Sequence, residues 1–168
     1  MKKIGLFYGT STTKTAKIAK KVKTAFDDAQ IDVIPVENAW KKDFEDYENI
    51  IIGVSTWFDG ELPNYWDEVK PELESLKMKG KKIAIFGLGD QVKYPENFID
   101  GVGILAETFE SVGAKLVGFT STDGYNFEMS RAIRDGKFMG LAIDIENQSK
   151  KTDERIKDWI EQLKKEFD

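Results

Sequence analysis

The sequence predicts an α/β fold in which helices cover both faces of a parallel β-sheet. Short apolar runs alternate with segments of helical periodicity along the whole chain, as in successive βαβ units. The runs are almost continuously apolar, which is typical of strands buried on both faces. The chain has 168 residues and shows no repeat, linker or low-complexity tract, so we expect a single domain spanning residues 1–168.

The first part of the chain contains three predicted strands. Ile4–Tyr8 is a short apolar run, and a helix follows it with apolar positions at Ile18, Val22, Ala25 and Phe26. Val33–Val36 is a weaker strand, and its Pro35 suits a sheet edge because proline donates no ladder hydrogen bond. Ile50–Val54 is the clearest buried strand. The helix after it has apolar positions at Trp66, Val69, Leu73 and Leu76.

The second part adds two strands and two helices. Lys82–Gly87 is a strand, and the helix after it stops at Gly113 and has apolar positions at Phe98, Ile99, Val102, Leu105, Ala106, Phe109 and Val112. Leu116–Phe119 is the fifth strand. The irregular residues 120–138 follow it, and a strand-like run at 139–143 suggests that they interrupt this strand. The last helix is capped by Thr152 or Asp153, with apolar positions at Ile156, Trp159, Ile160, Leu163 and Phe167.

The composition excludes several kinds of chemistry. The chain has no His and no Cys, so it has no Ser-His-Asp or Cys-His machinery, no disulfide, no Cys/His zinc site and no Cys-ligated iron–sulfur cluster. A bound organic cofactor is then the simplest source of redox activity. The net charge of −5 argues against a nucleic-acid surface. No apolar run approaches the ~20 residues of a membrane span or forms a signal peptide, so we expect a cytoplasmic protein.

Hydroxyl side chains fill the turn between the first strand and the first helix. The residues of this turn are Thr10, Ser11, Thr12, Thr13, Lys14 and Thr15. Because a helix N-terminus presents unpaired N–H groups and the positive end of the dipole, the turn suits a phosphate. A helix cap is the alternative, although a cap needs only one such residue. The turn matches neither the P-loop nor the Gly-x-Gly-x-x-Gly pattern.

Two loops rich in aromatic, glycine and acidic residues follow the third and fourth predicted strands. Residues 55–62 contain Trp57, and residues 87–97 contain Tyr94. Ligands of open α/β sheets bind beyond the carboxyl ends of the strands, so we expect the two rings on opposite faces of one flat ligand. The alternative is that each ring only covers the sheet edge. The other tryptophans are interpreted as packing residues: Trp40, Trp66 and Trp159.

Taken together, these segments resemble the long-chain flavodoxins over essentially all of the chain. The resemblance lies in ordered stretches: residues 4–10, 56–57, 60–62, 87–91, 94, 97–98, 121–125, 136–138, 141–142, 144, 147–148 and 152–155. It implies a flavodoxin-like three-layer sandwich with a five-stranded parallel sheet of order 2-1-3-4-5. It also implies that the insertion near 120–138, which separates long-chain from short-chain members, interrupts the last strand.

The resemblance implies that the chain binds FMN non-covalently. The residues expected to bind the phosphate are Thr10, Ser11, Thr12, Thr13, Lys14 and Thr15. Thr56 and Trp57 are expected at one face of the ring, and Tyr94 at the other. Phe58, Asp59 and Gly60 are expected to form the turn near flavin N5. The residues expected around the pyrimidine end of the ring are Leu88, Gly89, Asp90 and Asn97, and Glu146 is expected near the ribityl chain. Three residues depart from the family pattern: Thr13 stands at a common Gly, Ser55 at a common Pro and Glu146 at a common Asp.

The function implied is low-potential electron transfer, one electron at a time, without substrate turnover. The expected partners are a flavodoxin reductase or another electron donor and an electron-accepting enzyme, and the chain is expected to be a monomer. Carboxylates beside the ring would lower the potential of the reduced cofactor, and a turning peptide at Phe58–Asp59 would stabilise the neutral semiquinone. The alternative is an FMN-dependent NAD(P)H:quinone reductase. A phospho-receiver domain is disfavoured because it needs an acceptor Asp where the chain has Val54, Ser55 and Thr56.

Overall fold

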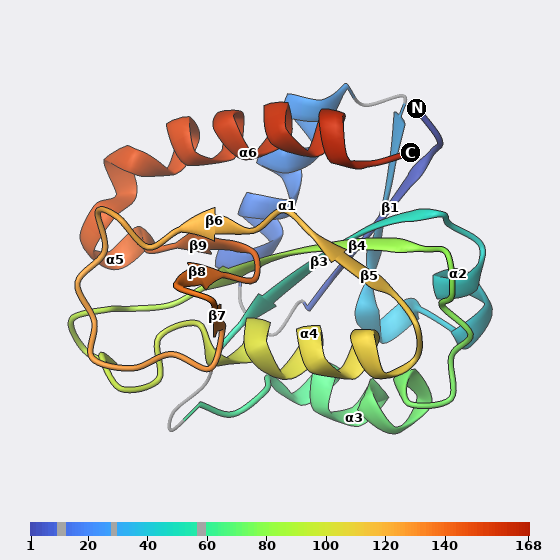
Figure 1. Ribbon diagram of the computed structural model, residues 1–168, viewed down its shortest axis with the longest axis horizontal. Coiled ribbons are helices and arrows are strands. Elements are labelled where there is room, and N and C mark those ends of the chain that lie inside the picture. Colours follow the sequence, from blue (N-terminus) through green and yellow to red (C-terminus); the bar gives the residue numbers. More distant parts are fainter. Residues whose placement is uncertain (10–12, 28–29, 57–59) are drawn as a thin grey trace.

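A parallel sheet lies between two layers of helices (Figure 1). The computed structural model describes residues 1–9, 13–27, 30–56 and 60–168. In spatial order, the strands are β2 (Ile31–Pro35), β1 (Ile4–Tyr8), β3 (Asn49–Ser55), β4 (Lys82–Leu88) and then β5 (Lys115–Val117) with β9 (Leu141–Ile143). The predicted order 2-1-3-4-5 is confirmed, and β2, which ends on Pro35, is an edge strand.

The last position in the sheet is shared by two short strands. β5 pairs with the first half of β4, with Ala84 opposite Val117. β9 pairs with the second half, with Phe86 opposite Leu141, and both pairings are parallel. Together β5 and β9 therefore form one interrupted strand, as the sequence predicted.

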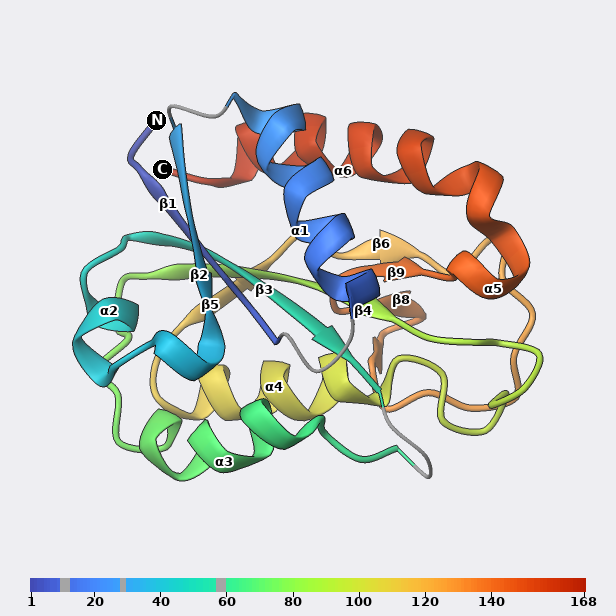
Figure 2. The same cartoon turned by 180° about the vertical axis from the view of Figure 1, so that it is seen from behind.

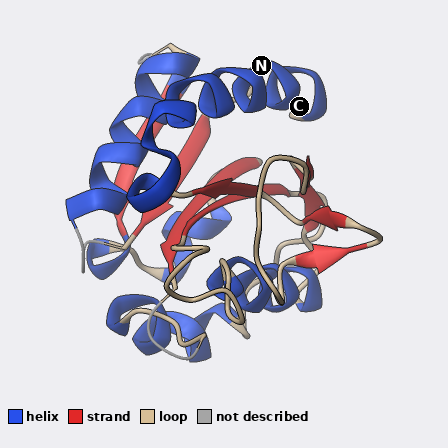
Figure 3. Cartoon of the chain, turned by 90° about the vertical axis from the view of Figure 1, so that its left-hand side faces the viewer, coloured by secondary structure: helices blue, strands red, loops and turns tan. Residues whose placement is uncertain are grey.

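The two faces of the sheet are covered by different helices (Figures 1 and 2). α1 (Thr13–Phe26) and α6 (Thr152–Glu166) lie on one face, and α2 (Lys41–Glu45), α3 (Asn64–Leu73) and α4 (Asp100–Ser111) lie on the other. Viewed from the side, the helices stand above and below the strands (Figure 3). Within β3, Ile51 packs toward α1 and α6, whereas Ile50 and Ile52 pack toward α3 and α4. This alternation buries both faces of a continuously apolar strand.

Two of the three tryptophans interpreted as packing residues are in the core. Trp66 and Trp159 are fully buried, one in each apolar layer. The same interpretation is wrong for Trp40, whose exposed fraction is 76%. Trp40 follows the short 3-10 helix η2 (Val36–Asn38) and immediately precedes α2, so it lies outside any apolar face with helical spacing.

The helix ends differ from prediction in α3, α4 and α6. α4 begins at Asp100, so Phe98 and Ile99 precede it, and Val112 and Phe167 are the C-cap positions of α4 and α6 rather than helical residues. α3 ends at Leu73, so Leu76 lies beyond the helix although it remains buried. α6 is preceded by α5 (Ile145–Gln148) and the 3-10 turn η3 (Ser149–Lys151), and its N-cap position is Lys151. Thr152 already has helical angles, φ −58° and ψ −52°, so neither it nor Asp153 is the cap. Thr152 and Asp153 are the first two residues of the helix itself, and Lys151 precedes them without a side-chain cap hydrogen bond.

Residues 120–138 are more regular than the sequence suggested. They contain β6 (Thr120–Ser121), β7 (Ile133–Arg134) and β8 (Lys137–Phe138), which form a small antiparallel sheet. Asp135 and Gly136 join β7 to β8 with positive φ angles of 52° and 79°. This is the two-residue turn that matches the twist of a hairpin, and Asp-Gly is its usual sequence.

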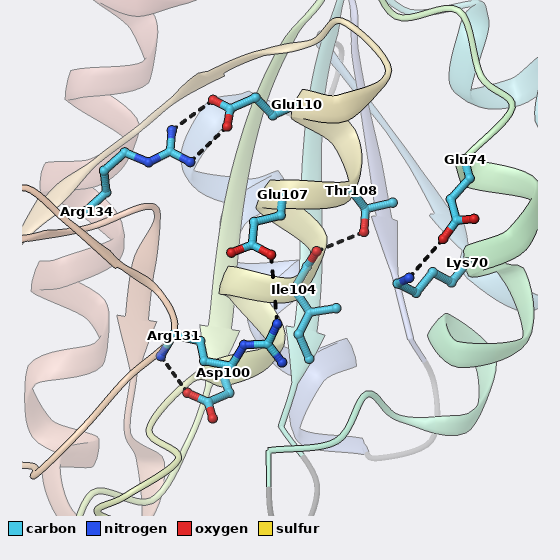
Figure 4. A network of polar contacts seen from close by, with 9 residues as sticks. All are labelled: Lys70, Glu74, Asp100, Ile104, Glu107, Thr108, Glu110, Arg131 and Arg134. Atoms are coloured by element: carbon cyan, nitrogen blue, oxygen red, sulfur yellow. Dashed lines mark hydrogen bonds and ion pairs between the residues drawn. The ribbon is translucent and has the colours of Figure 1, made fainter.

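Ion pairs fasten the insertion to α4 (Figure 4). Arg134 donates two hydrogen bonds to Glu110, both of 2.8 Å, and this pair lowers the pKa of the Glu110 carboxyl. The guanidinium of Arg131 lies 3.8 Å from the carboxylate of Glu107, and the backbone N–H of Arg131 donates to the Asp100 carboxylate at 2.7 Å. The insertion is therefore held against the helix that follows the β4 loop.

Candidate functional site

A cavity of about 410 Å³ lies where the carboxyl ends of β3, β4 and β9 meet the start of α1. Its lining residues are Lys14, Ser55, Thr56, Leu88, Gly89, Asp90, Lys93, Tyr94, Ile145 and Glu146. The volume is within the usual range for a small-molecule site, and the position is the edge at which open α/β sheets bind ligands.

Backbone hydrogen bonds hold the strand ends together at this edge. The N–H of Thr56 donates to the Leu88 carbonyl at 3.3 Å, and the N–H of Gly89 donates to the Ile143 carbonyl at 3.0 Å. The Thr56 hydroxyl accepts from the N–H of Gly101 at 2.8 Å, which joins the β3 loop to the first turn of α4. The cavity wall is thus built on the rigid sheet.

Asp90 shapes the loop that carries Tyr94. Its Oδ1 atom accepts from the N–H groups of Val92 at 3.1 Å and Lys93 at 2.9 Å, and its carbonyl accepts from the Tyr94 N–H at 2.9 Å. Burial acts to raise the pKa of Asp90, but hydrogen bonds from Lys93, Asn147 and Val92 outweigh it and hold that pKa below its usual value. The turn leaves the Tyr94 ring at the rim of the cavity, 39% exposed, with the Lys93 ammonium 5.6 Å from its centroid.

Charges of both signs line the cavity. Lys14, in the first turn of α1, forms an ion pair with Glu146 of α5. The first turn of α1 contains no acidic residue, so the positive end of its dipole adds to the Lys14 charge. Asp90 and Glu146 supply carboxylates to the same cavity.

A larger hollow of about 490 Å³ lies between α1 and α6. The described residues that line it all belong to these two helices, and four are lysines: Lys17, Lys20, Lys21 and Lys157. No strand-end loop residue that the structure describes lines this hollow, so the cavity at the carboxyl edge is the better candidate for a ligand site.

Comparisons with known proteins agree with this geometry. Residues 6–159 match the protein family described as Flavodoxin. The chain is 48% identical over 166 residues to the flavodoxin of a Nostoc species, which covers 99% of this chain and 98% of the relative. The chain belongs to the flavodoxin family. It is also 42% identical over 172 residues to flavodoxin 1 of Azotobacter vinelandii, covering 99% of this chain and 98% of that flavodoxin.

A solved flavodoxin has nearly the same fold. The crystal structure of Fusobacterium nucleatum flavodoxin bound to flavin mononucleotide superposes with a TM-score of 0.96 and 39% identity, covering 100% of both chains. The predictions of family and fold are therefore confirmed. Flavodoxins are electron carriers rather than enzymes and transfer electrons to redox partners, so the quinone reductase alternative is set aside.

The structure brings many of the predicted flavodoxin site residues into one cavity. These are Lys14, Thr56, Leu88, Gly89, Asp90, Tyr94 and Glu146. Three further residues line the cavity that were not among the predicted cofactor-binding residues: Ser55, Lys93 and Ile145. The sequence signal for these three residues was their position next to Thr56, Tyr94 and Glu146, because neighbouring residues of a tight loop commonly line the same cavity.

Other predicted residues lie outside the cavity lining. Thr13 is exposed at the first position of α1, and Thr15 is buried in the same turn. Gly60 has a φ of +86°, and a Cβ there would lie 2.6 Å from the Asp100 carboxylate, so only glycine fits. Asn97 donates to that carboxylate at 3.2 Å. The remaining predicted positions lie outside the described residues: Thr10, Ser11, Thr12, Trp57, Phe58 and Asp59.

Proposed function

We propose that this chain carries electrons one at a time on non-covalently bound FMN, between redox partner proteins and without substrate turnover of its own. The observation that carries the proposal is the cavity at the carboxyl edge of the sheet, which combines the Tyr94 ring, the Thr56 hydroxyl and the Lys14 ammonium. The similar Fusobacterium nucleatum flavodoxin was crystallised with flavin mononucleotide, which supports the choice of cofactor.

The lining residues fit the chemical parts of FMN. Tyr94 offers an aromatic face to a flat ring, and such stacking contributes about 1–3 kcal/mol. Thr56 begins the loop expected over the other face of the ring, and Lys14 beside the α1 N-terminus offers positive charge to a phosphate. When bound, FMN would supply one-electron oxidation and reduction.

The carboxylates would make the bound cofactor harder to reduce. Asp90 and Glu146 line the cavity, and the lowered pKa of Asp90 keeps it ionised at neutral pH. Negative charge added to the ring on reduction would be destabilised by these carboxylates, and more strongly the closer they lie to the ring. A tenfold preference for one redox state over the next shifts a one-electron potential by ~60 mV. The low potential of this proposal requires that the carboxylates act on the ring more strongly than Lys14 and Lys93, which line the same cavity.

The other predicted positions and properties complete the proposal. Thr10, Ser11, Thr12, Thr13 and Thr15 would surround the phosphate, while Trp57, Phe58, Asp59, Gly60 and Asn97 would complete the ring site. The partners would be a flavodoxin reductase or another electron donor and an electron-accepting enzyme. The chain would act as a monomeric, cytoplasmic single domain of residues 1–168, without nucleic-acid or membrane binding. Among the described residues, no helix has the length and apolarity needed to cross a bilayer.

A flavin-binding experiment tests the function. The purified protein is stripped of ligand, incubated with FMN and passed through a desalting column, and the visible spectrum of the protein fraction is recorded. We expect FMN to remain bound and a stepwise dithionite titration to resolve two one-electron couples. A folded protein that emerges colourless, or one that oxidises NAD(P)H with a quinone in the absence of a reductase, would overturn the proposal.

A further inference from the structure

The ion pair between Lys14 and Glu146 lies in the wall of the proposed cofactor cavity. Both side chains line the cavity, and both are about half exposed, 53% for Lys14 and 47% for Glu146. The pair joins the first turn of α1 to α5, two elements far apart in the sequence. Without ligand, the Lys14 ammonium therefore already has an anionic partner.

A phosphate entering this cavity would meet both charges. A phosphate monoester carries about −1.5 to −2 charges at pH 7, so it attracts Lys14 and is repelled by Glu146. Lys14 has three N–H donors, but a carboxylate and a phosphate on the same ammonium also face each other. Among the described lining residues, the other charged ones are Asp90 and Lys93, which offset one another in sign. The Lys14–Glu146 pair is thus the charge pair that a phosphate at the α1 N-terminus must disturb.

We infer that Glu146 sets the selectivity between phosphorylated and unphosphorylated flavins by competing with the phosphate for Lys14. The inference rests on the proposed function, because it assumes that a flavin occupies the cavity. Glu146 lowers the advantage of FMN over riboflavin, which shares the ring and the ribityl chain but has no phosphate. Exposed ion pairs are weak, so removing the Glu146 charge should raise this advantage about three- to fivefold.

The selectivity is measured as the ratio of the dissociation constant for riboflavin to that for FMN. Both constants are obtained for the apoprotein by quenching of flavin fluorescence at one ionic strength. The variants are Glu146→Gln, Lys14→Met and the double variant. We expect Glu146→Gln to raise the ratio about three- to fivefold, mainly through tighter FMN binding, and Lys14→Met to lower it. In the Lys14→Met background, Glu146→Gln should change the ratio less than twofold.

Two outcomes would overturn the inference. If Glu146→Gln changes both dissociation constants by the same factor, Glu146 acts on a part of the flavin that both ligands share. If the gain in ratio persists in full with Lys14→Met, Glu146 acts without Lys14. Failure of flavin binding itself is a separate result, because the wild-type protein would then bind neither flavin, and NAD(P)H oxidation without a reductase would overturn the proposed function without changing the selectivity ratio.

The chain contains a matched control pair. Lys21 of α1 and Asp153 of α6 form an exposed ion pair of 2.6 Å, also between α1 and the C-terminal region, and neither lines this cavity. Asp153→Asn removes the same charge and frees a lysine of the same helix. We expect its selectivity ratio to equal that of the wild type. A ratio raised as much as by Glu146→Gln would indicate a general effect of net charge and would also overturn the inference.

Discussion

Gln91 donates two hydrogen bonds to one carboxylate oxygen of Asp144, from its backbone N–H at 3.1 Å and from its side-chain amide at 2.7 Å. The other oxygen of Asp144 accepts from the N–H of Asn147 at 3.0 Å, and Asp144 is fully buried. The amide oxygen of Gln91 accepts from the N–H of Asn126 at 2.6 Å. One buried carboxylate thus links the β4 loop, α5 and the insertion.

Replacing Asp144 with Ala should therefore destabilise the protein and loosen the cavity. The two donors of Gln91, which is buried, would be left without an acceptor, and such a loss costs about 3 kcal/mol of the free energy of unfolding. Because the same loop carries Tyr94, FMN affinity should also fall. Urea unfolding of the apoprotein and FMN titration measure the two effects. The control is Asp158→Ala on the exposed face of α6, which should stay within about 0.5 kcal/mol of wild type; equal stability of the two variants would contradict the role of Asp144.

The lowered pKa of Asp90 predicts a defined pH dependence of stability. Its folded-state pKa is below the usual 3.8, so the ionised form contributes stability above that value, and the contribution is lost as pH falls through the folded pKa. Asp90→Asn keeps a side-chain oxygen for the turn but removes the charge. The difference in unfolding free energy between wild type and Asp90→Asn should be constant from pH 7 to about 5 and shrink below about pH 4. A difference that stays constant down to pH 3 would show that the charge of Asp90 is unimportant.

The sheet was predictable because its strands are apolar on both faces, a pattern that few other structures produce. The site edge was predictable because parallel strands present all their carboxyl ends at one side. The role of Asp144 was not, since one carboxylate in a sequence rich in acids carries no sign of burial. The prediction that Trp40 is a packing residue failed for a related reason, because an isolated aromatic residue has no periodic partners that define a buried face. Ile99, whose φ of 48° is unusual for a β-branched residue, is held there by tertiary packing and leaves no local signal.

Tyr94 should contribute measurably to flavin affinity. Tyr94→Ala removes the aromatic side chain of the cavity rim and should raise the dissociation constant for FMN about 5- to 150-fold, in line with about 1–3 kcal/mol for stacking. Tyr65→Ala is a matched control, because Tyr65 is 37% exposed against 39% for Tyr94 and does not line the cavity. Fluorescence titration of both variants gives the comparison. Equal affinities in the two variants would remove Tyr94 from the binding surface.

Gly140 should tolerate no side chain, because the chain returns there from the insertion directly against β4. A Cβ at Gly140 would overlap the carbonyl oxygen of Ile85 and lie 3.3 Å from a methyl group of Val102. A backbone atom inside a sheet cannot move aside, so Gly140→Ala should force β9 away from β4 and reduce the free energy of unfolding by about 3 kcal/mol. Gly136→Ala isolates the effect of backbone angle, since Gly136 has a φ of +79° and nothing within 4 Å of an added Cβ. That change should cost only about 1 kcal/mol. Chemical denaturation gives the free energy of unfolding of both variants. If Gly136→Ala lowered it more than Gly140→Ala, the glycines at the end of the insertion would be needed for their backbone angles and not for close approach.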